Sequence, residues 1–212
     1  SKLMAQRDLI LYSLPGVAQS LYVNPSRAPH KAVHIGLPFM SSVSLHHRNT
    51  LFNPGRLFKN TEGRTEFQTQ EFLDEIRDKN SLGVDMSIDI FSLGIPVKNH
   101  YFSLAVREKV TSELSLPGDL LRFPFIGNGD FDATGGSLDF SGLGVELNHY
   151  VEYGFGWQTM IKDKFSFGAR AKMLFGKENI RTRVDNLNWN TDPLTYEWTY
   201  SGDMEVNTSG MS

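Results

Sequence analysis

Residues 143–161, LGVELNHYVEYGFGWQTMI, alternate almost without error between apolar side chains and polar or glycine positions, and His149 is the clearest exception on the apolar parity. Successive side chains of a β-strand point to opposite faces, so this pattern predicts a strand with one apolar and one polar face. Soluble strands typically run about 5–6 residues, whereas a strand that crosses a bilayer at a tilt needs roughly 9–11. The apolar parity ends in Tyr153, Phe155 and Trp157, which is typical of the aromatic girdle of a membrane barrel. We therefore interpret the segment as a strand of an outer-membrane β-barrel.

The composition is compatible with a barrel. The chain has 212 residues, a formal net charge of -3 and no cysteine. No run of about eighteen apolar residues occurs, which excludes a transmembrane helix but not a barrel, because only every second residue of a barrel strand faces lipid. The slight excess of acidic residues argues against a nucleic-acid partner, which would require clustered Lys and Arg.

The same period-two pattern recurs in four further segments, namely 33–45, 82–96, 101–113 and 164–176. In each of them one parity is mostly apolar and the other carries polar, charged or glycine residues. Weaker strands are expected at 194–201 and 203–209. Because only residues 162–164 separate the strand at 139–161 from the next one, we expect these two strands to be adjacent and antiparallel.

The connections between the strands alternate between long and short. The long ones are 46–81, 115–137 and 185–193, and the short ones lie near 97–100 and at 162–164. Outer-membrane barrels have this asymmetry, with long loops outside and short turns on the periplasmic side. A soluble β-sandwich gives no reason for such alternation and is kept as the alternative.

The first long connection is predicted to contain a short amphipathic helix at about 66–78. Phe67, Phe72, Leu73 and Ile76 follow helical spacing there, and Thr65 is the expected N-cap. The helix would pack its apolar face on the barrel mouth; a lid or a partner-docking helix is the alternative.

The N-terminal residues 1–30 are expected to precede the strands. Residues 1–6, SKLMAQ, are typical of a secretory signal remnant, with a cloning remnant as the alternative. Residues 7–30 contain several prolines and no sustained period, and they cannot lie in lipid with unpaired backbone amides. We predict that they cap or plug the periplasmic end of the barrel, with Asn24 and Pro25 forming the turn that leads to the first strand. The apolar contacts of this plug would come from Leu9, Leu11 and Leu14.

Segments in order along most of the chain resemble a Bacteroidota family of outer-membrane β-barrels of unknown function. The similar segments are LYSLPGVAQSLYVNPSRAP, HIGLPFMSSVSL, EFLDEIRDKN, HYFSLAVREKV, FSGLGVELNHYVEYGFGW, DKFSFGARAKMLFGKENI and EVNTSG. One departure is Asn24-Pro25-Ser26, which stands where these barrels usually have Asn-Pro-Ala. The family is similar in style to fatty-acid-transporter-like barrels and to the shuttle barrel of type IX secretion. The resemblance therefore implies a porin-like barrel in the outer membrane of a Gram-negative bacterium, with a role in transport or secretion.

We count six strands, or seven if 203–209 forms one. Bacterial single-chain barrels have an even number of strands, starting at about eight, and open sheet edges in lipid are prohibitively costly. We therefore expect an all-β fold in which residues 31–212 supply the first strands of one transmembrane antiparallel up-and-down β-barrel domain. These strands would be the N-terminal portion of a larger barrel, preceded by the signal remnant and cap in residues 1–30.

The polar parity supplies the candidate site. The predicted lumen-facing charged residues are Asp85, Asp89, Arg107, Lys109, Glu146, Glu152, Arg170 and Lys172. Glu146 and Glu152 are expected to meet Arg170 and Lys172, because their strands are adjacent. Such pairs would brace the wall, or alternatively line a conduit that selects a solute by charge. No nucleophile lies beside the carboxylates, so we expect no enzymatic activity, no catalytic residue, no cofactor and no metal site.

The apolar parity supplies the candidate lipid contacts. The predicted lipid-facing residues are Val84, Ile88, Leu104, Val145, Leu147, Tyr153, Phe155, Trp157, Phe165, Phe167 and Ala171. His149 interrupts this parity, and we expect it near a membrane interface or against a protein partner. The expected partners are outer-membrane lipid and other outer-membrane proteins, with no nucleic acid.

Three functions from different classes follow from these expectations. The favoured one is a non-enzymatic subunit of an outer-membrane secretion or assembly complex. The second is a passive transporter or channel for a small solute, hydrophobic or not. The third is a soluble β-sandwich binding module, for which the strands are too long.

Overall fold

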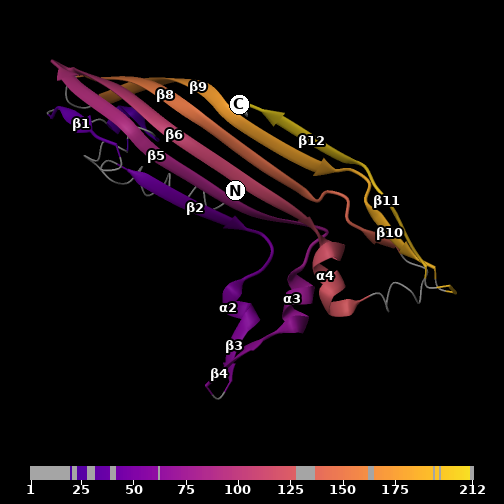
Figure 1. Cartoon of the computed structure of the whole chain (residues 1–212). Helices are drawn as coiled ribbons and strands as arrows, with labels where there is room; N and C mark the ends of the chain where they lie inside the picture. Colours follow the sequence, from indigo (N-terminus) through magenta and orange to yellow (C-terminus); the bar gives the residue numbers. More distant parts are fainter. Residues whose placement is uncertain are drawn as a thin grey trace. The chain divides into compact units, whose positions relative to one another are not determined.

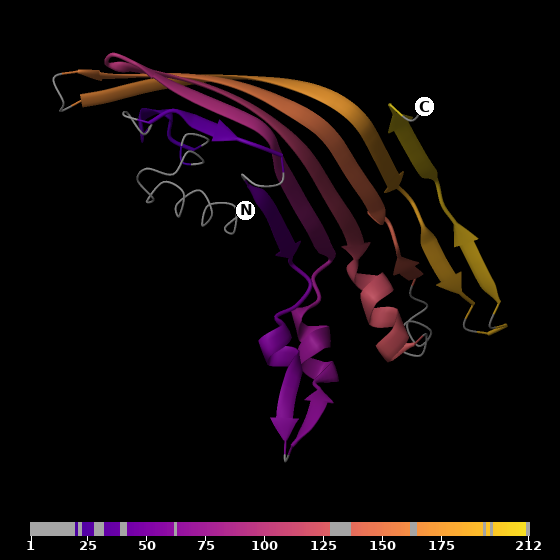
Figure 2. The same cartoon turned by 60° about the vertical axis from the view of Figure 1, so that its left-hand side comes forward.

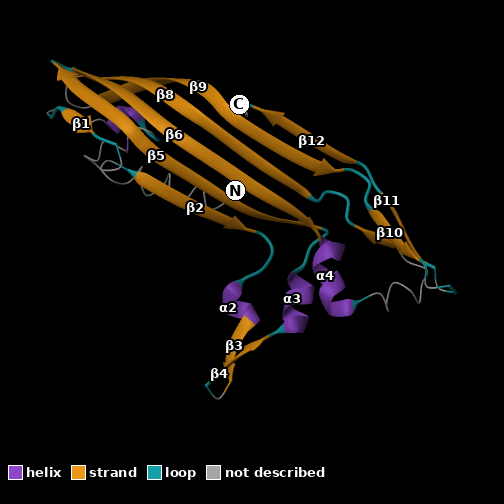
Figure 3. Ribbon diagram, viewed as in Figure 1, coloured by secondary structure: helices purple, strands orange, loops and turns teal. Residues whose placement is uncertain are grey.

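The computed structural model describes residues 20, 23–27, 32–38, 42–61, 63–127, 137–161, 165–192, 194–195 and 197–210. In this part of the chain the fold is mostly β, with antiparallel sheets and a few short helices (Figure 3). The expectation of a mostly β, antiparallel fold is confirmed, and the described residues do not form a closed barrel. None of the described helices has the length and apolarity needed to cross a membrane.

The largest sheet contains seven strands. Its order is β1 (His34–Gly36), β5 (Lys79–Val97), β6 (His100–Pro117), β8 (Gly144–Ile161), β9 (Phe165–Val184) and β12 (Met204–Ser209), and β2 (Val43–Asn49) also pairs with β5 (Figure 1). The register places His34 opposite Gly94 and Met204 opposite Val184. Two pairs of consecutive strands, β5 with β6 and β8 with β9, lie next to one another in the sheet, as the sequence predicted for the hairpin of β8 and β9.

Three of the central strands, β5, β6 and β9, are longer than the alternating segments that predicted them, whereas β8 is shorter than the predicted strand at 139–161. Strand β5 has 19 residues, β6 and β8 have 18 each, and β9 has 20. The single strand predicted at 33–45 is instead two, β1 and β2, which both pair with β5. Pro38 follows β1, and because proline has no N–H to donate, it is poorly suited to continue a ladder.

The chain divides into two compact units. The first contains residues 1–46, 85–110 and 148–177, and the second contains 47–84, 111–147 and 178–212. Each unit includes a stretch of β5, β6, β8 and β9, and each is described here by itself.

The second unit has a small hydrophobic core built from the first long connection. After β2 the chain forms α2 (Pro54–Leu57), the hairpin of β3 (Phe58–Thr61) and β4 (Arg64–Phe67), and α3 (Thr69–Glu75) (Figure 2). The core consists of Leu51, Leu57, Phe72 and Ile76, with Phe52, Leu73, Leu82, Leu116 and Leu121 packed around it. The apolar spacing of the predicted helix is thus explained by burial of Phe72 and Ile76.

The bounds predicted for this helix were wrong. It begins at Thr69 rather than near residue 66, and its N-cap residue is Gln68, which makes no side-chain capping bond. Thr65, the predicted N-cap, lies in β4 opposite Asn60. Pairing in the β3–β4 hairpin satisfies the backbone of residues 64–67, so the helix starts only after the hairpin ends.

The second unit also contains a three-stranded sheet in the order β11 (Trp198–Ser201), β10 (Asn188–Thr191) and β7 (Ser137–Asp139). Helix α4 (Gly118–Ile126) lies in the connection that was predicted to be a loop. Pro124 within the helix is the reason that sequence reasoning missed it, since proline usually ends a helix. Phe123 of α4 packs on Trp189 of β10, with 5.7 Å between ring centroids.

Candidate functional site

One face of the sheet in the first unit is apolar and exposed, and we call it the apolar face. Phe165 and Phe167 of β9 are 73% and 59% exposed there. The other exposed large hydrophobic residues of this face are Val33, Ile35, Leu37, Val43, Leu45, Met86, Ile95, Val97, Phe102, Tyr153, Phe155, Ile161, Met173 and Phe175. Soluble monomers rarely expose contiguous apolar patches larger than a few hundred Å², so a surface of this extent is typical of contact with lipid or protein.

The predicted lipid-facing residues are largely accessible. Val84, Val145, Tyr153, Phe155, Phe165, Phe167 and Ala171 are exposed. Ile88, Leu104, Leu147 and Trp157 are half-buried. Val84, Val145 and Leu147 belong to the second unit and the remainder to the first.

Val151 is buried on the apolar parity of β8, but most buried residues of the long strands in the first unit lie on the opposite, polar face. They are Ser87, Asp89, Ser92, Arg107, Glu152 and Gln158, together with Tyr101 and Ala105. Burial in β5 alternates up to Asp89 and then shifts by one residue to Ser92 and Gly94, as at a β-bulge. The two adjacent apolar residues Ile90 and Phe91 mark this shift in the sequence.

Five charged side chains of the polar face form a connected set, which we call the charge cluster. They are Asp89 of β5, Arg107 and Lys109 of β6, Glu152 of β8 and Lys172 of β9. Arg107 Nε lies 3.0 Å from Asp89 Oδ1, and Arg107 Nη1 lies 3.5 Å from Glu152 Oε1. The Nζ atoms of Lys109 and Lys172 lie 2.8 Å and 3.8 Å from Glu152 Oε2. The sign of the charge therefore alternates across four neighbouring strands.

The cluster combines strong burial with complete pairing of its carboxylates. The side chains of Asp89, Arg107 and Glu152 are 2%, 5% and 3% exposed. Desolvating such ions costs several kcal/mol each, and their mutual attraction offsets that cost only when the geometry is good. The cluster is therefore weak evidence for stability in itself, but removal of one member leaves an uncompensated buried charge. The planar guanidinium of Arg107 suits the central position, because it can serve two carboxylates at once.

Sequence reasoning identified these residues but only part of their pairing. The expected contact of Glu152 with Lys172 is present. The bridge from Asp89 through Arg107 to Glu152 was not predicted, because it depends on β6 lying beside β8 across a long connection. Of the other predicted charges, Asp85 lies on the same strand face as Asp89, and Glu146 is exposed and belongs to the second unit.

Arg170, also predicted for this face, reaches back over β8. A Cβ at Gly154 would lie 2.2 Å from Arg170 Nη2, so the absence of a side chain at residue 154 makes room for the guanidinium.

The described part of the predicted cap lies against the polar face of the first unit. A short 3-10 helix, η2 (Pro25–Arg27), follows Asn24, whose Oδ1 accepts hydrogen bonds from the Ser26 N–H (3.0 Å) and hydroxyl (2.7 Å). The Ser26 carbonyl accepts from the side chains of Gln158 and Ser166. The predicted contacts of Leu9, Leu11 and Leu14 lie outside the described residues.

Gly168 makes this docking geometrically feasible. A Cβ at residue 168 would lie 2.5 Å from the carbonyl carbon and oxygen of Pro25. The backbone of residues 25–26 thus occupies the space that a side chain at residue 168 would need. The contacts of Gln158 and Ser166 with this segment were not predicted. Both residues stand on the polar parity of their strands, β8 and β9, and this was the signal in the sequence that could have indicated them.

A second polar group lies on the apolar face of the first unit, and we call it the polar row. Glu108 Oε1 lies 2.7 Å from His149 Nε2 and 2.6 Å from Lys177 Nζ. The three residues come from β6, β8 and β9. His149 was noticed as an exception in its strand, but Glu108 and Lys177 also stand on the apolar parity of theirs, so the row was detectable from parity.

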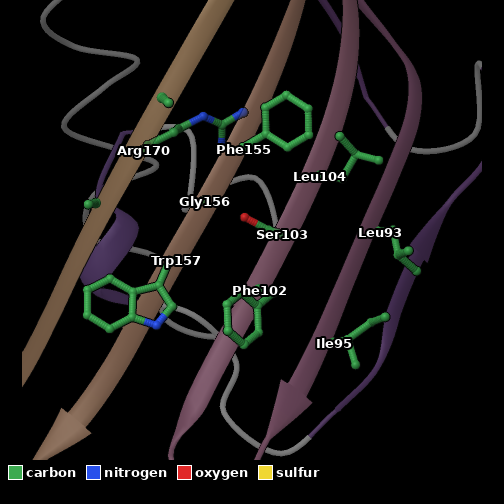
Figure 4. Close-up of a pocket in the computed structure, with 11 residues that line it drawn as sticks. Leu93, Ile95, Phe102, Ser103, Leu104, Phe155, Gly156, Trp157 and Arg170 are labelled. Atoms are coloured by element: carbon green, nitrogen blue, oxygen red, sulfur yellow. The ribbon is translucent and has the colours of Figure 1, made fainter.

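An apolar cavity opens on the same face (Figure 4). Its volume is ≈ 570 Å³, and its lining comes from β5, β6, β8 and β9 of the first unit. Phe102, Phe155 and Trp157 supply aromatic walls, while Ser103 and Arg170 are its polar lining residues (Figure 4). A Cβ at Gly156 would lie 2.3 Å from Ser103 Oγ, so the Ser103 hydroxyl occupies the space beside this glycine.

Outside the long strands, the carboxylate of Asp139 in the second unit is held by its neighbour. The Ser141 hydroxyl and the Ser141 N–H, which lies 2.8 Å from Oδ1, lower the pKa of Asp139 below its usual range. Among the described residues, no group of three or more His, Asp or Glu side chains is arranged to hold a metal ion.

Comparison with known proteins gives a family match. The model of a family of unknown function (DUF5723) matches residues 25–212, which is most of the chain. No curated protein and no solved structure matches.

Proposed function

This chain belongs to the family of unknown function DUF5723, and from that premise we propose that it forms part of the wall of an outer-membrane β-barrel. The barrel acts without enzymatic activity, as a subunit of an outer-membrane secretion or assembly complex of a Gram-negative bacterium. The resemblance of the sequence to Bacteroidota barrels, similar in style to fatty-acid-transporter-like barrels and the type IX shuttle barrel, supports this assignment.

The observation that carries the proposal is the contrast between the two faces of the sheet in the first unit. The apolar face exposes Phe165 and Phe167 at 73% and 59%, while Asp89 and Arg107 on the polar face are 1% and 4% exposed. A soluble protein has the reverse arrangement, with charges outside and large apolar side chains inside. A sheet that is apolar toward its surroundings and polar toward its interior is the arrangement of a barrel wall in a bilayer.

The strand lengths support the same assignment. A strand that crosses the hydrocarbon at a tilt needs roughly 9–11 residues. Strands β5, β6, β8 and β9 have 18 to 20 residues each and can therefore cross it and extend beyond. Since open edges in lipid leave backbone groups unsatisfied, the edges of such a wall must pair with further strands.

A soluble β-sandwich is the less favoured assignment. In a sandwich, the apolar faces of two sheets pack on each other at about 10 Å. The apolar face of the first unit is instead exposed along β1, β2, β5, β6, β8 and β9.

The inaccessible charges and the docked segment on the polar face favour a subunit over an open conduit. An open lumen would keep charged groups in water, yet Asp89, Arg107 and Glu152 are nearly inaccessible. The turn at Asn24 and Pro25 also docks on this face through the Ser26 carbonyl. Both features favour an interior that is braced and capped.

A passive transporter for a small hydrophobic solute is the second candidate, and one observation favours it. The cavity of ≈ 570 Å³ on the apolar face has aromatic walls and reaches Ser103 and Arg170, which belong to the polar parity. A volume of about 300–1,000 Å³ is usual for small-molecule sites.

Isolation of the full-length protein from outer membranes in a mild detergent distinguishes the two candidates. The subunit proposal expects a second outer-membrane protein to co-purify in a fixed ratio, and no conductance or solute uptake by the purified barrel in vesicles. A barrel that purifies alone and takes up a hydrophobic solute, with uptake abolished by Gly156→Leu in its cavity, would contradict it and favour the transporter. Retention of the protein in the soluble fraction after native expression would contradict the membrane assignment itself.

A further inference from the structure

The polar row interrupts a surface that is otherwise apolar. Glu108 is shared between His149 and Lys177, with Nε2–Oε1 and Nζ–Oε1 distances of 2.7 Å and 2.6 Å. The exposed fractions of the side chains are 30% for Glu108, 20% for His149 and 48% for Lys177. Polar groups inside a hydrocarbon layer are costly, so the level of this row along the strands carries information.

Strand β9 shows where the row stands. From its first residue, the positions of the apolar parity are Phe165, Phe167, Ala169, Ala171, Met173 and Phe175, and the next is Lys177. At about 3.3 Å per residue, the stretch from Phe165 to Phe175 is roughly 33 Å long. With a strand tilt of about 40°, it spans about 25 Å along the membrane normal, which is the height of the apolar band of outer-membrane barrels. The row therefore begins where that band ends.

The opposite end of the band is aromatic. Trp157 lies 6.0 Å from the ring of Phe167 and 6.0 Å from the ring of His100, measured between centroids. His100 in turn lies near Phe102, so β6, β8 and β9 all contribute rings. Aromatic side chains at the headgroup level of both interfaces are typical of membrane barrels.

We propose that the polar row lies at the headgroup level of the bilayer and that the Lys177 ammonium binds a lipid phosphate. The inference rests on the proposed function, because it requires the apolar face to contact lipid. Lys177 is suited to this contact: its ammonium has three donors, Glu108 accepts one of them, and about half of the side chain is exposed. Glu108 of β6 anchors the lysine, and His149 of β8 contacts Glu108, so that the row fixes the depth of the sheet. By the same geometry, Ala171 lies near the bilayer midplane and Phe175 lies at the edge of the hydrocarbon.

Depth-resolved fluorescence quenching tests the predicted level. The 212 residues contain no cysteine, so cysteines introduced one at a time at residues 165, 171 and 175 can carry a fluorophore in the full-length protein once any cysteine outside these residues is replaced. In phosphatidylcholine–phosphatidylglycerol vesicles, lipids brominated near the chain end should quench the label of Ala171→Cys most strongly. Lipids brominated near the glycerol should instead quench the labels of Phe165→Cys and Phe175→Cys. Lys172→Cys, on the polar face, is the matched control and should be quenched by neither lipid.

The phosphate contact is tested by solid-state NMR on the same vesicles. Lysine 15Nζ signal should be dephased by lipid 31P, and Lys177→Met should remove that dephasing while Lys172→Met should not. Quenching of residue 175 by the deep bromines, or dephasing unchanged in Lys177→Met, would overturn the inference while leaving the barrel intact. Absence of quenching at all three outward labels would instead overturn the proposed function, so the two failures are distinguishable.

Discussion

The Nε atom of Arg107 lies 3.0 Å from Oδ1 of Asp89, and the two side chains are only 5% and 2% exposed. The pair joins β6 to β5, and the same guanidinium reaches Glu152 on β8. Three strands are thereby linked through one buried cation on the polar face. Arg107 is the most deeply buried cation of the charge cluster, and its loss would remove this buried positive charge from beside Asp89.

Replacement of Arg107 by methionine should lower the free energy of unfolding by about 3–5 kcal/mol, because the buried Asp89 carboxylate would lose this counter-ion. Glu152 would keep the contacts with Lys109 and Lys172. Denaturant titration of the refolded protein in detergent or vesicles measures the loss. Lys172→Met is the control: its side chain is 44% exposed, so its removal should cost about 0–1 kcal/mol. Equal effects of the two substitutions would show that water reaches Arg107 and its partners.

Gly168→Ala should displace the turn of residues 24–27 from the polar face. The new methyl group would lie 2.5 Å from the backbone of Pro25, which cannot move aside without moving the turn. Gly156→Ala is the matched control, since its methyl group would meet the Ser103 hydroxyl, which can rotate away. Hydrogen exchange of the Ser26 and Arg27 amides should rise in the first variant and stay unchanged in the second. Unchanged exchange in both would argue against docking of the segment on β9.

The alternation of the sequence predicted which side chains share a face, and it did so because the period of a strand is fixed at two. It also predicted that β8 and β9 are neighbours, since a three-residue turn leaves no alternative, and hence the contact of Glu152 with Lys172. The bridge through Arg107 could not be predicted in the same way. It requires β6 beside β8, and a long connection does not dictate that pairing.

Local signals were missed where two elements compete for the same residues. Thr65 is a residue type that favours the helix N-cap position. It instead lies in the β3–β4 hairpin, where it pairs with Asn60. Helix α4 was not predicted because it contains Pro124, and proline usually ends a helix. The polar row was not predicted, although Glu108 and Lys177, like His149, stand on the apolar parity of their strands.

The pKa of Asp139 should lie below its usual value of 3.8, because the Ser141 hydroxyl and N–H stabilise the carboxylate. A lowered pKa in the folded state means that this interaction stabilises the fold above the unfolded pKa and is lost as the pH falls through the folded one. Ser141→Ala should move the pKa of Asp139 upward toward 3.8, with part of the shift retained through the backbone N–H. Carboxyl 13C shifts recorded against pH measure this directly. A pKa of Asp139 that is the same in both proteins would show that the hydroxyl makes no contribution.

Ala171→Arg should destabilise the protein in vesicles by about 2–4 kcal/mol, the cost of an arginine near the bilayer midplane on the lipid face of a barrel. Ala171 is exposed on the apolar face, in the middle of the apolar stretch of β9. An arginine at this position is far from water at both ends of the stretch, whereas an arginine at residue 165 is close to one end. Phe165→Arg, at the start of β9, should show a charge-dependent cost of only about 0–1 kcal/mol beyond the loss of the ring. The neighbouring Lys172→Arg keeps its charge on the polar face and should be close to neutral. Urea titrations of the unsubstituted protein and of these variants in vesicles give the comparison. The variant Phe165→Leu corrects for the loss of the ring. A neutral Ala171→Arg would mean that water, and not hydrocarbon, faces this part of the sheet, and the membrane assignment would then be wrong.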